Sequence, residues 1–368
     1  MLKVLDRYRF TVYFCTIIVM LVSLSSCTKK ELPNIASIKT KLIDLALTDS
    51  VKVENVTIDQ LYVNNYSDNH IVLDEWQSKL FQLKDFNKSI FISSKGRGPS
   101  QYLGATLIIF DAQKSEFSIF DVRNAKLITF DDELNYISER SFKSEEIWLR
   151  AYISYTNDYE IYLAGIFEPK KSYNRNFLES KTIAVMKSDS IISLAGIVPN
   201  DLAKLDMLHV SPVSNQDPFS NRFIQTWLTE PIIIIYDYSK TDHIINQSYK
   251  INNYPTLFNI LEDKPTMQDD MLTRRKEMTA NSYVRSIYLV ENKIYLLFSN
   301  YTMQGHLEQD SNLFEYFIAI YDLDQEKWIY EKQLDEIALA VDFQHRLYTN
   351  KVVGNDSWIK RYQISYEE

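Results

Sequence analysis

The chain has 368 residues, of which 45% are hydrophobic and 24% are charged, so its composition is that of a folded globular protein and not of a disordered chain. Its formal net charge of −9 argues against nucleic acid as a partner, because phosphate binding needs a basic surface. Seven glycines leave little material for the glycine-rich loops that hold nucleotide phosphates. Aromatic residues make up 13% of the chain, and they favour β-strands.

The first residues have the features of an export signal. Lys3, Arg7 and Arg9 precede an apolar stretch that runs from Phe10 to Leu24. This stretch is shorter than the roughly 20 apolar residues of a membrane-spanning helix, and a basic start followed by an apolar segment is typical of a secretory signal. We therefore predict that residues 1–26 are a signal peptide that is removed from the mature protein.

The sequence Leu24-Ser25-Ser26-Cys27 ends this segment and resembles the lipobox, the signal of bacterial lipoproteins. The resemblance implies that Cys27 is the lipid attachment site and that residues 27–37 form a lipidated N-terminus and tether. The alternatives are a plain signal peptide with an incidental cysteine, or an N-terminal membrane helix. Cys15 lies inside the predicted signal, so the mature chain is expected to contain no disulfide.

The residues after Cys27 bear on the location of the protein. Several acyl chains anchor a protein stably, so the membrane is an expected partner. An aspartate directly after the lipidated cysteine is associated with retention in the inner membrane, and the residues after Cys27, which include Lys29 and Lys30, do not have this pattern. We therefore expect an outer-membrane lipoprotein of the cell envelope, and the sequence leaves open whether its domain is periplasmic or surface-exposed.

From about Ile38 onward, short runs rich in Val, Ile, Tyr and Phe alternate with Asn, Asp, Ser and Lys. This is the pattern of strands joined by polar turns, and it predicts an all-β domain. The clearest runs are Gln60–Asn64, His70–Asp74, Lys79–Leu83, Phe117–Asp121, Ile161–Ala164, Ile232–Tyr236, Lys293–Phe298, Phe317–Tyr321 and Arg346–Thr349.

A faint internal repeat indicates the architecture. Phe117–Asp121, Ile233–Asp237 and Ile318–Asp322 each end in an aromatic residue followed by Asp, and each is followed by a polar turn and a second strand. An Asp in such a position can accept hydrogen bonds from its own downstream backbone. Repeated four-stranded units of this size form a β-propeller. We predict a six-bladed β-propeller over residues 38–368, with a two-domain β-sandwich as the weaker alternative.

Two further segments belong to this prediction. Ile38–Leu47 is expected to complete the last blade beside the C-terminal Trp358–Ser365, because closing the ring in this way removes exposed sheet edges. Met267–Met278 is rich in Met, Glu, Lys and Arg and poor in β-branched residues. We expect it to form a short helical insertion between blades.

The segment around Gly96 is the most distinctive in the chain. Gly96, Gly98, Pro99 and Tyr102 match a Gly-x-Gly-Pro-x-x-Tyr/Phe loop. With the lipobox, this loop makes the chain resemble the TolB-like six-bladed β-propeller lipoproteins of Gram-negative gut anaerobes. The resemblance covers about residues 38–366. It implies a fold and an envelope location, since most members of that family have no established activity.

The same loop holds the first candidate ligand-binding residues. Arg97 lies between the two glycines, and its guanidinium can bind a carboxylate or a sugar acid through two parallel hydrogen bonds. Gln101 and Tyr102 follow it and are candidates for the same site. The alternative is a structural loop whose role is to pack Tyr102 between blades.

A second candidate region is the polar stretch Pro199–Arg222. We expect a long loop on one face of the propeller, where binding sites are common, with His209 and Arg222 as candidate ligand contacts. The alternative is an ordinary connection between blades.

The sequence shows no pattern typical of a metal site or of a catalytic nucleophile. The five histidines lack the spacing of metal-ligand pairs. Asp131–Glu133 and Asp269–Asp270 are interpreted as solvated turns rather than calcium sites. The Gly-x-Ser-x-Gly motif of serine nucleophiles is absent from the sequence. We expect no metal, no cofactor and no catalytic residue. The leading interpretation is a lipid-anchored module that binds or scaffolds an envelope protein or a glycan. A glycan-active lyase or hydrolase in the propeller funnel is the alternative, because paired carboxylates converge in space and not in sequence.

Overall fold

The computed structural model divides the chain into two compact units, Met1–Thr40 and Lys41–Glu368. It describes residues 43–366 except for residues 59, 66, 75–78, 95, 97–99, 104, 112–115, 122–123, 125, 142–147, 156–159, 168–179, 188–189, 201, 203–211, 217–219, 261–280 and 301–313. The predicted signal peptide, Cys27 and the predicted tether therefore lie outside the described residues, and they stay predictions.

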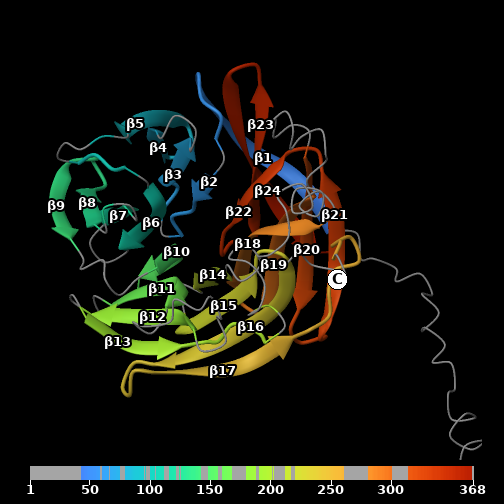
Figure 1. Ribbon diagram of the computed structural model, residues 1–368. Helices are drawn as coiled ribbons and strands as arrows, with labels where there is room; N and C mark the ends of the chain where they lie inside the picture. Colours follow the sequence, from blue (N-terminus) through green and yellow to red (C-terminus); the bar gives the residue numbers. More distant parts are fainter. Residues whose placement is uncertain are drawn as a thin grey trace, which may run out of the picture. The chain divides into compact units, whose positions relative to one another are not determined.

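The described part of the second unit is built from strands (Figure 1). In chain order they are β1 (Ile43–Val53), β2 (Gln60–Tyr62), β3 (His70–Asp74), β4 (Lys79–Lys84), β5 (Lys88–Ser94), β6 (Ala105–Asp111), β7 (Glu116–Asp121), β8 (Lys126–Asp131), β9 (Tyr136–Ser141), β10 (Trp148–Tyr155), β11 (Glu160–Phe167), β12 (Lys181–Lys187), β13 (Ser190–Ala195), β14 (Pro212–Gln216), β15 (Arg222–Trp227), β16 (Glu230–Ser239), β17 (Ile244–Ile251), β18 (Ser282–Val290), β19 (Lys293–Asn300), β20 (Glu315–Asp322), β21 (Lys327–Leu334), β22 (Ile337–Val341), β23 (Arg346–Val353) and β24 (Asp356–Tyr366).

These strands form six antiparallel four-stranded sheets. Blades 1 to 5 are β2–β5, β6–β9, β10–β13, β14–β17 and β18–β21, and blade 6 is β22–β24 with β1. The first strands of neighbouring blades contact one another around the ring, including β22 with β2. The all-β prediction of a six-bladed β-propeller is confirmed, and a two-domain β-sandwich is excluded for the described chain.

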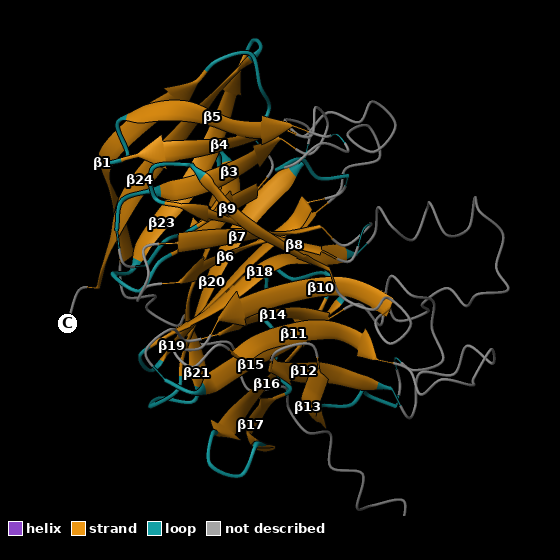
Figure 2. Ribbon diagram, turned by 90° about the vertical axis from the view of Figure 1, so that its left-hand side faces the viewer, coloured by secondary structure: helices purple, strands orange, loops and turns teal. Residues whose placement is uncertain are grey.

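Strand β1 closes the ring. It pairs antiparallel with β24, from Ile43 opposite Tyr366 to Val53 opposite Ser357, with a bulge near Leu47. Figure 2 shows β1 and β24 side by side at one edge of the propeller. The expected closure of the last blade by an N-terminal strand is therefore confirmed. This strand continues past Leu47 to Val53, and residues 38–42 of the predicted strand lie outside the described residues.

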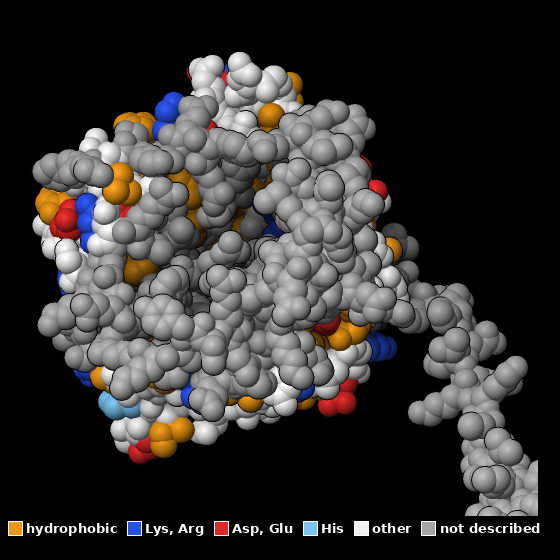
Figure 3. Space-filling model, viewed as in Figure 1, with side chains coloured by type: hydrophobic (Ala, Val, Ile, Leu, Met, Phe, Trp, Pro, Cys, Tyr) orange, Lys and Arg blue, Asp and Glu red, His pale blue; other side chains and the backbone are white. Residues whose placement is uncertain are grey.

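The antiparallel order gives the propeller two different faces. The turns between first and second strands and between third and fourth strands lie at one face, which we call the short-turn face. Its described turns lie within 63–69, 85–87, 132–135, 220–221, 240–243, 291–292, 323–326 and 342–345. The links between blades and the turns between second and third strands lie at the other, the connection face. In Figure 3, which shows the side seen in Figure 1, charged side chains of both signs lie along the rim of the described part.

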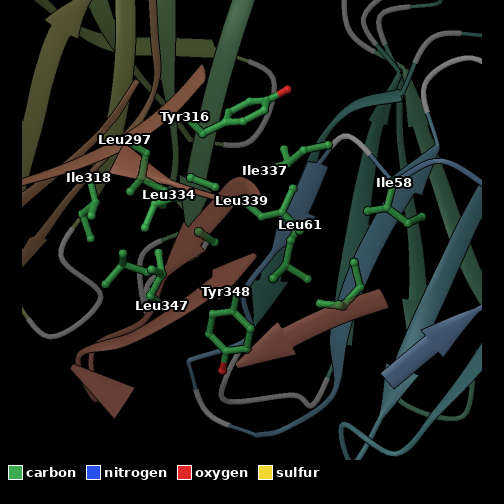
Figure 4. Packing of buried hydrophobic residues seen from close by; sticks show 14 of the residues in the cluster. Ile58, Leu61, Leu297, Tyr316, Ile318, Leu334, Ile337, Leu339, Leu347 and Tyr348 are labelled. Atoms are coloured by element: carbon green, nitrogen blue, oxygen red, sulfur yellow. The ribbon is translucent and has the colours of Figure 1, made fainter. Parts of the chain in front are cut away.

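Apolar side chains between neighbouring blades form the core. One cluster joins blades 5, 6 and 1 through residues such as Leu297, Leu347 and Leu61, and Figure 4 shows these side chains converging from different blades. Aromatic residues contribute as well: Phe298 and Phe317 of blade 5 stack with ring centroids 5.0 Å apart, in a second cluster that includes Ile224 of blade 4. The high aromatic content is thus used, in these clusters, to fill the core between blades.

The structure corrects the register of the internal repeat. Phe117–Asp121 lies in β7, the second strand of its blade, whereas Ile233–Asp237 and Ile318–Asp322 lie in β16 and β20, the third strands of theirs. The matching strand of blade 2 is β8, which ends in Phe130-Asp131. The error arose because β7 and β8 both end in Phe-Asp.

The expected role of the turn aspartates is confirmed at Asp121, which accepts from the Asn124 N–H at 3.3 Å on the connection face, and at Asp322. Asp131 of β8 and Asp322 act in this way on the short-turn face. The Asp131 carboxylate accepts hydrogen bonds from the N–H groups of Glu133 and Asn135, at 3.0 and 2.7 Å. The Asp322 carboxylate accepts from the N–H groups of Asp324 and Gln325, at 2.9 and 3.0 Å. These aspartates therefore close turns on the short-turn face.

Scarce glycine leaves several turns with side chains in the left-handed region. Leu134, His243, Glu291, Glu326 and His345 all have φ between 51° and 69°. This conformation costs about 1–2 kcal/mol for a residue with a Cβ. The turns of the short-turn face therefore carry backbone strain that glycine would relieve.

The expected helical insertion, Met267–Met278, lies outside the described residues. The residues that the structure does describe contain no helix. Accordingly, none of them forms a helix with the length and apolar character needed to cross a membrane.

Candidate functional site

The loop predicted from Gly96 to Tyr102 links β5 to β6 on the connection face. Its ends are held by the backbone: the Gly96 N–H donates to the Tyr102 carbonyl at 2.9 Å, and the Ser93 hydroxyl donates to the Ser100 carbonyl at 2.8 Å. A Cβ at Gly96 would lie 2.1 Å from the Gln101 Oε1, so a larger residue here would require the end of the Gln101 side chain to move. Arg97 lies outside the described residues.

Tyr102 is placed in the core. Its side chain is 1% exposed and belongs to a cluster that includes Ile71 of blade 1 and Ile119 of blade 2. Burial, together with the nearby carboxylates of Asp74 and Asp121, raises the pKa of Tyr102. This position supports the structural alternative for Tyr102, while a ligand contact through Arg97 or Gln101 stays a prediction.

Arg222 lies on the opposite, short-turn face, at the start of β15. Its Nε donates to the Ser220 hydroxyl at 3.2 Å, and its guanidinium donates to the Glu291 carbonyl in blade 5 at 3.2 Å. Arg222 therefore links blades 4 and 5, and it does not share a site with Tyr102. The stretch Pro199–Arg222 is also not one loop, because it contains β14; His209 lies outside the described residues.

A polar network that the sequence reasoning missed joins blade 6 to blade 1. Its centre is Asp342, which follows β22 and accepts from the Tyr348 hydroxyl at 3.0 Å and from the Arg346 Nε at 2.5 Å. His70, the first residue of β3, contacts the same Tyr348 hydroxyl through its Nε2 at 3.1 Å. We call Asp68, His70, Asp342, Arg346, Tyr348 and Arg361 the closure network.

The hydrogen bonds assign the proton on His70. The Asn64 N–H donates to His70 Nδ1 at 3.1 Å, so Nδ1 is the accepting nitrogen and Nε2 carries the hydrogen. His70 therefore donates to the Tyr348 hydroxyl, which in turn donates to Asp342. Figure 4 shows the Tyr348 ring below Leu61, with its oxygen pointing away from the apolar cluster.

Two arginines complete the closure network. Arg361 of β24 donates to Asp68 of blade 1 at 2.9 Å and also binds Asp49 of β1. Arg346 donates to the same Asp68 oxygen at 3.3 Å. Burial alone would raise the pKa of Asp68, but Arg361 and Arg346 outweigh it and lower that pKa. These contacts tie β23 and β24 of blade 6 to blade 1.

On its other side, the same turn of blade 6 reaches blade 5. His345 Nδ1 bonds the Tyr295 hydroxyl, which also bonds the Tyr366 hydroxyl. His345 Nε2 lies 3.6 Å from the Glu291 carboxylate. The turn from Asp342 to Arg346 therefore contacts both neighbouring blades.

The electrostatics keep these groups in one protonation state near neutral pH. Burial lowers the pKa of His70 to about 3, and it also lowers the pKa of His345, although Glu291 opposes the shift. Burial raises the pKa of Tyr348 and of Tyr295, and it raises that of Tyr366 to about 12. Neutral histidines and tyrosines suit hydrogen bonding between blades better than proton transfer, which needs a pKa near the working pH.

Metal binding has no support in the part of the chain that the structure describes. Among those residues no group of three or more His, Cys, Asp or Glu side chains is arranged to hold an ion. The acidic run Asp131–Glu133 forms a turn, as interpreted from the sequence, and Asp131 uses its oxygens within that turn. Asp269–Asp270 lies outside the described residues.

A signal for the closure network is present in the sequence, but its meaning depends on the fold. Asp68-x-His70 and Asp342-x-x-His345-Arg346 both occupy the turn between the first and second strands of a blade. Once the blades are assigned, the two motifs fall in adjacent blades at the same level of the ring. Without that assignment they are unrelated pairs 278 residues apart.

The fold is shared with solved structures of proteins from Bacteroides. A member of the DUF4221 family from Bacteroides vulgatus ATCC 8482 matches with a TM-score of 0.61 and 10% identity, over 89% of this chain and 100% of that one. A protein from Bacteroides fragilis NCTC 9343, provisionally described as exported, matches with a TM-score of 0.55 and 11% identity, over 90% and 97%. At this identity the likeness shows the fold alone.

Sequence-level comparisons add no closer relationship. No family model matches the chain, and no curated protein matches it. The protein is therefore a six-bladed β-propeller with structural neighbours in Bacteroides. The TolB-like and lipoprotein resemblances stay predictions.

Proposed function

We propose that this protein is a lipid-anchored β-propeller of the cell envelope that binds or scaffolds another envelope component. The observation that carries the proposal is the separation of the chain into Met1–Thr40 and a propeller that closes on itself from Ile43 to Tyr366. This division leaves the lipobox and the tether outside the closed ring, as an anchored domain requires. The exported description of the Bacteroides fragilis neighbour agrees with this location.

The binding surface is assigned to the connection face, at the loop that holds Arg97 and Gln101. The guanidinium of Arg97 suits a carboxylate or a sugar acid. His209 precedes β14, in another link between blades, and is the second contact that we propose. The described ends of the Gly96 loop are hydrogen bonded, which supports a preformed surface.

A glycan-active enzyme is the second candidate. The observation that favours it is the chain of contacts from Glu291 through His345 to Tyr295, which places a carboxylate, an imidazole and a phenol together on the short-turn face. We rank it second because burial raises the pKa of Tyr295, so this phenol is a poor base near neutral pH.

Anchoring is tested by Cys27→Ser in the full chain expressed in a Gram-negative host. We expect the wild type to be recovered in the outer membrane with an acylated N-terminal peptide in mass spectrometry, and the variant to lose acylation. Cys15→Ser is the matched control, because Cys15 lies in the predicted leader, and it should leave acylation unchanged. An acylated Cys27→Ser protein would refute the anchor.

Binding is tested by thermal shift of the soluble chain from Thr28 against sugar acids, neutral glycans and calcium. A ligand at 100 times its Kd adds about 2.7 kcal/mol of stability, which is a measurable shift. Arg97→Ala should remove a shift caused by a sugar acid, and Arg222→Ala should keep it. Turnover of a glycan in the same panel, lost in His345→Gln, would instead favour the enzyme.

A further inference from the structure

We propose that the short-turn face is the side of the propeller turned towards the membrane, so that the connection face is presented to ligands. The inference rests on the proposed lipid anchor at Cys27. Its independent basis is the direction of β1, which fixes where the anchored segment joins the ring.

The join lies at the short-turn face. Ile43, the first residue of β1, is opposite Tyr366, the last residue of β24. β24 is the third strand of blade 6, and it begins at Asp356 after the tight turn at Gly354 on the connection face. Its far end is therefore at the short-turn face, and the chain enters the propeller there.

The tether is short compared with the height of the blade. Sixteen residues lead from Cys27 to Ile43, and a random coil of that length has a mean end-to-end distance of about 22 Å. The 11 residues of β24 span about 36 Å. To bring the connection face to the bilayer, the tether would have to extend along the whole side of blade 6, which loses most of its conformational freedom. The short-turn face is favoured because it needs no such extension.

The charge of this face indicates how it meets the membrane. Within its described turns Lys240 is the one Lys or Arg, and Arg222, Lys293 and Lys327 lie at adjoining strand ends. Seven carboxylates in these turns are exposed: Asp85, Asp132, Glu133, Asp242, Glu291, Asp324 and Glu326. An acidic surface is repelled by anionic lipid. The face therefore stands off from the bilayer at the length of the tether, and attachment depends on the acyl chains.

The mature chain allows a direct test because its one cysteine, Cys27, is the proposed acylation site. Asp324 and Asp335 are both exposed, and they flank β21 at opposite faces of blade 5. Asp324→Cys and Asp335→Cys change the same residue type, so they form a matched pair. Each acylated variant is labelled with a fluorophore and reconstituted into vesicles of phosphatidylethanolamine and phosphatidylglycerol that carry a rhodamine lipid as energy acceptor.

We expect energy transfer to the lipid to be at least twofold greater from the Asp324→Cys label than from the Asp335→Cys label. Equal or reversed transfer in protein that floats with the vesicles overturns the orientation and leaves the anchor standing. Protein that does not float with the vesicles overturns the proposed anchor and, with it, the orientation. Thermal unfolding of both labelled variants at the wild-type temperature shows that the fold is intact.

Discussion

Removing the Tyr348 hydroxyl tests whether the closure network stabilises the ring. In Tyr348→Phe the aromatic ring stays in the core between blades, so no cavity forms. The change removes the acceptor of the His70 Nε2 hydrogen and one donor to Asp342. Both partners are buried, His70 at 0% and Asp342 at 1% exposure, so water cannot replace the lost bonds.

The expected loss of stability follows from these two bonds. A buried donor left without its acceptor costs about 1–3 kcal/mol. Asp342 keeps the Arg346 Nε and two backbone N–H groups, so its share is smaller, and we expect a total of about 2–3 kcal/mol. For a unit of about 330 residues the unfolding entropy is roughly 0.7 kcal/mol/K. The melting temperature should therefore fall by about 3–4 °C.

Calorimetry of the soluble chain measures this shift, and Tyr330→Phe is the matched control. Tyr330 is also buried in the cluster that joins blades 5, 6 and 1, but its hydroxyl has no hydrogen-bond partner among the described residues. Removing it should leave the melting temperature unchanged or raise it slightly. If Tyr348→Phe lowers the melting temperature no more than Tyr330→Phe does, the closure network does not stabilise the ring.

Three further changes test other parts of the structure. Burial holds the pKa of His70 in the folded chain at about 3, against 6.5 for the free side chain, so the unfolded chain binds one more proton between these pH values. The free energy of unfolding should therefore fall by about 1.4 kcal/mol per pH unit below pH 6.5. Urea titrations at pH 7 and pH 5 should show a smaller pH dependence for His70→Gln. Glu291→Gly should raise the free energy of unfolding by about 0.5–1 kcal/mol, because glycine relieves the strain of a φ of 54°. Gly354→Ala, at a φ of 64°, should lower it by about 1 kcal/mol. Shifts of the same sign in the two denaturant midpoints would contradict the strain argument. Unfolding followed by circular dichroism should be the same for a chain that begins at Lys41 as for the full chain. A chain that begins at Glu54 lacks β1 and should lose cooperative unfolding. Equal cooperativity of the two truncated chains would show that β1 is dispensable.

The fold was predictable because local patterns carry it. Apolar alternation marks most strands, and Asp322 closes its turn as its position after an aromatic residue suggests. The closing strand was predicted from its place at the start of the domain, and its pairing from Ile43 to Val53 agrees. The register of the repeat was not predictable, since β7 and β8 both end in Phe-Asp and only the sheet order distinguishes a second strand from a third.

The closure network could not be predicted from local patterns. His70 and Tyr348 are 278 residues apart, and each one taken singly looks like an ordinary strand residue. Arg222 makes a contact that its sequence position did not reveal: its guanidinium donates to the Glu291 carbonyl of the next blade, and its role as a ligand contact stays a prediction. A charged side chain in a propeller turn thus serves neighbouring blades as readily as it serves a ligand, and only the ring geometry separates the two roles.

The position of the closure network follows from the thermodynamics of closing the ring. Pairing Ile43 with Tyr366 closes a loop of more than 320 residues, and its entropy cost is on the order of 5 kcal/mol, growing only slowly with length. Contacts in blade 6, where the first and last strands of the domain pair, offset this entropy cost. Arg361 of β24 binds both Asp49 of β1 and Asp68 of blade 1, so one side chain joins the closing strand, the last strand and the first blade. The closure network therefore lies where the N-terminal strand joins the ring.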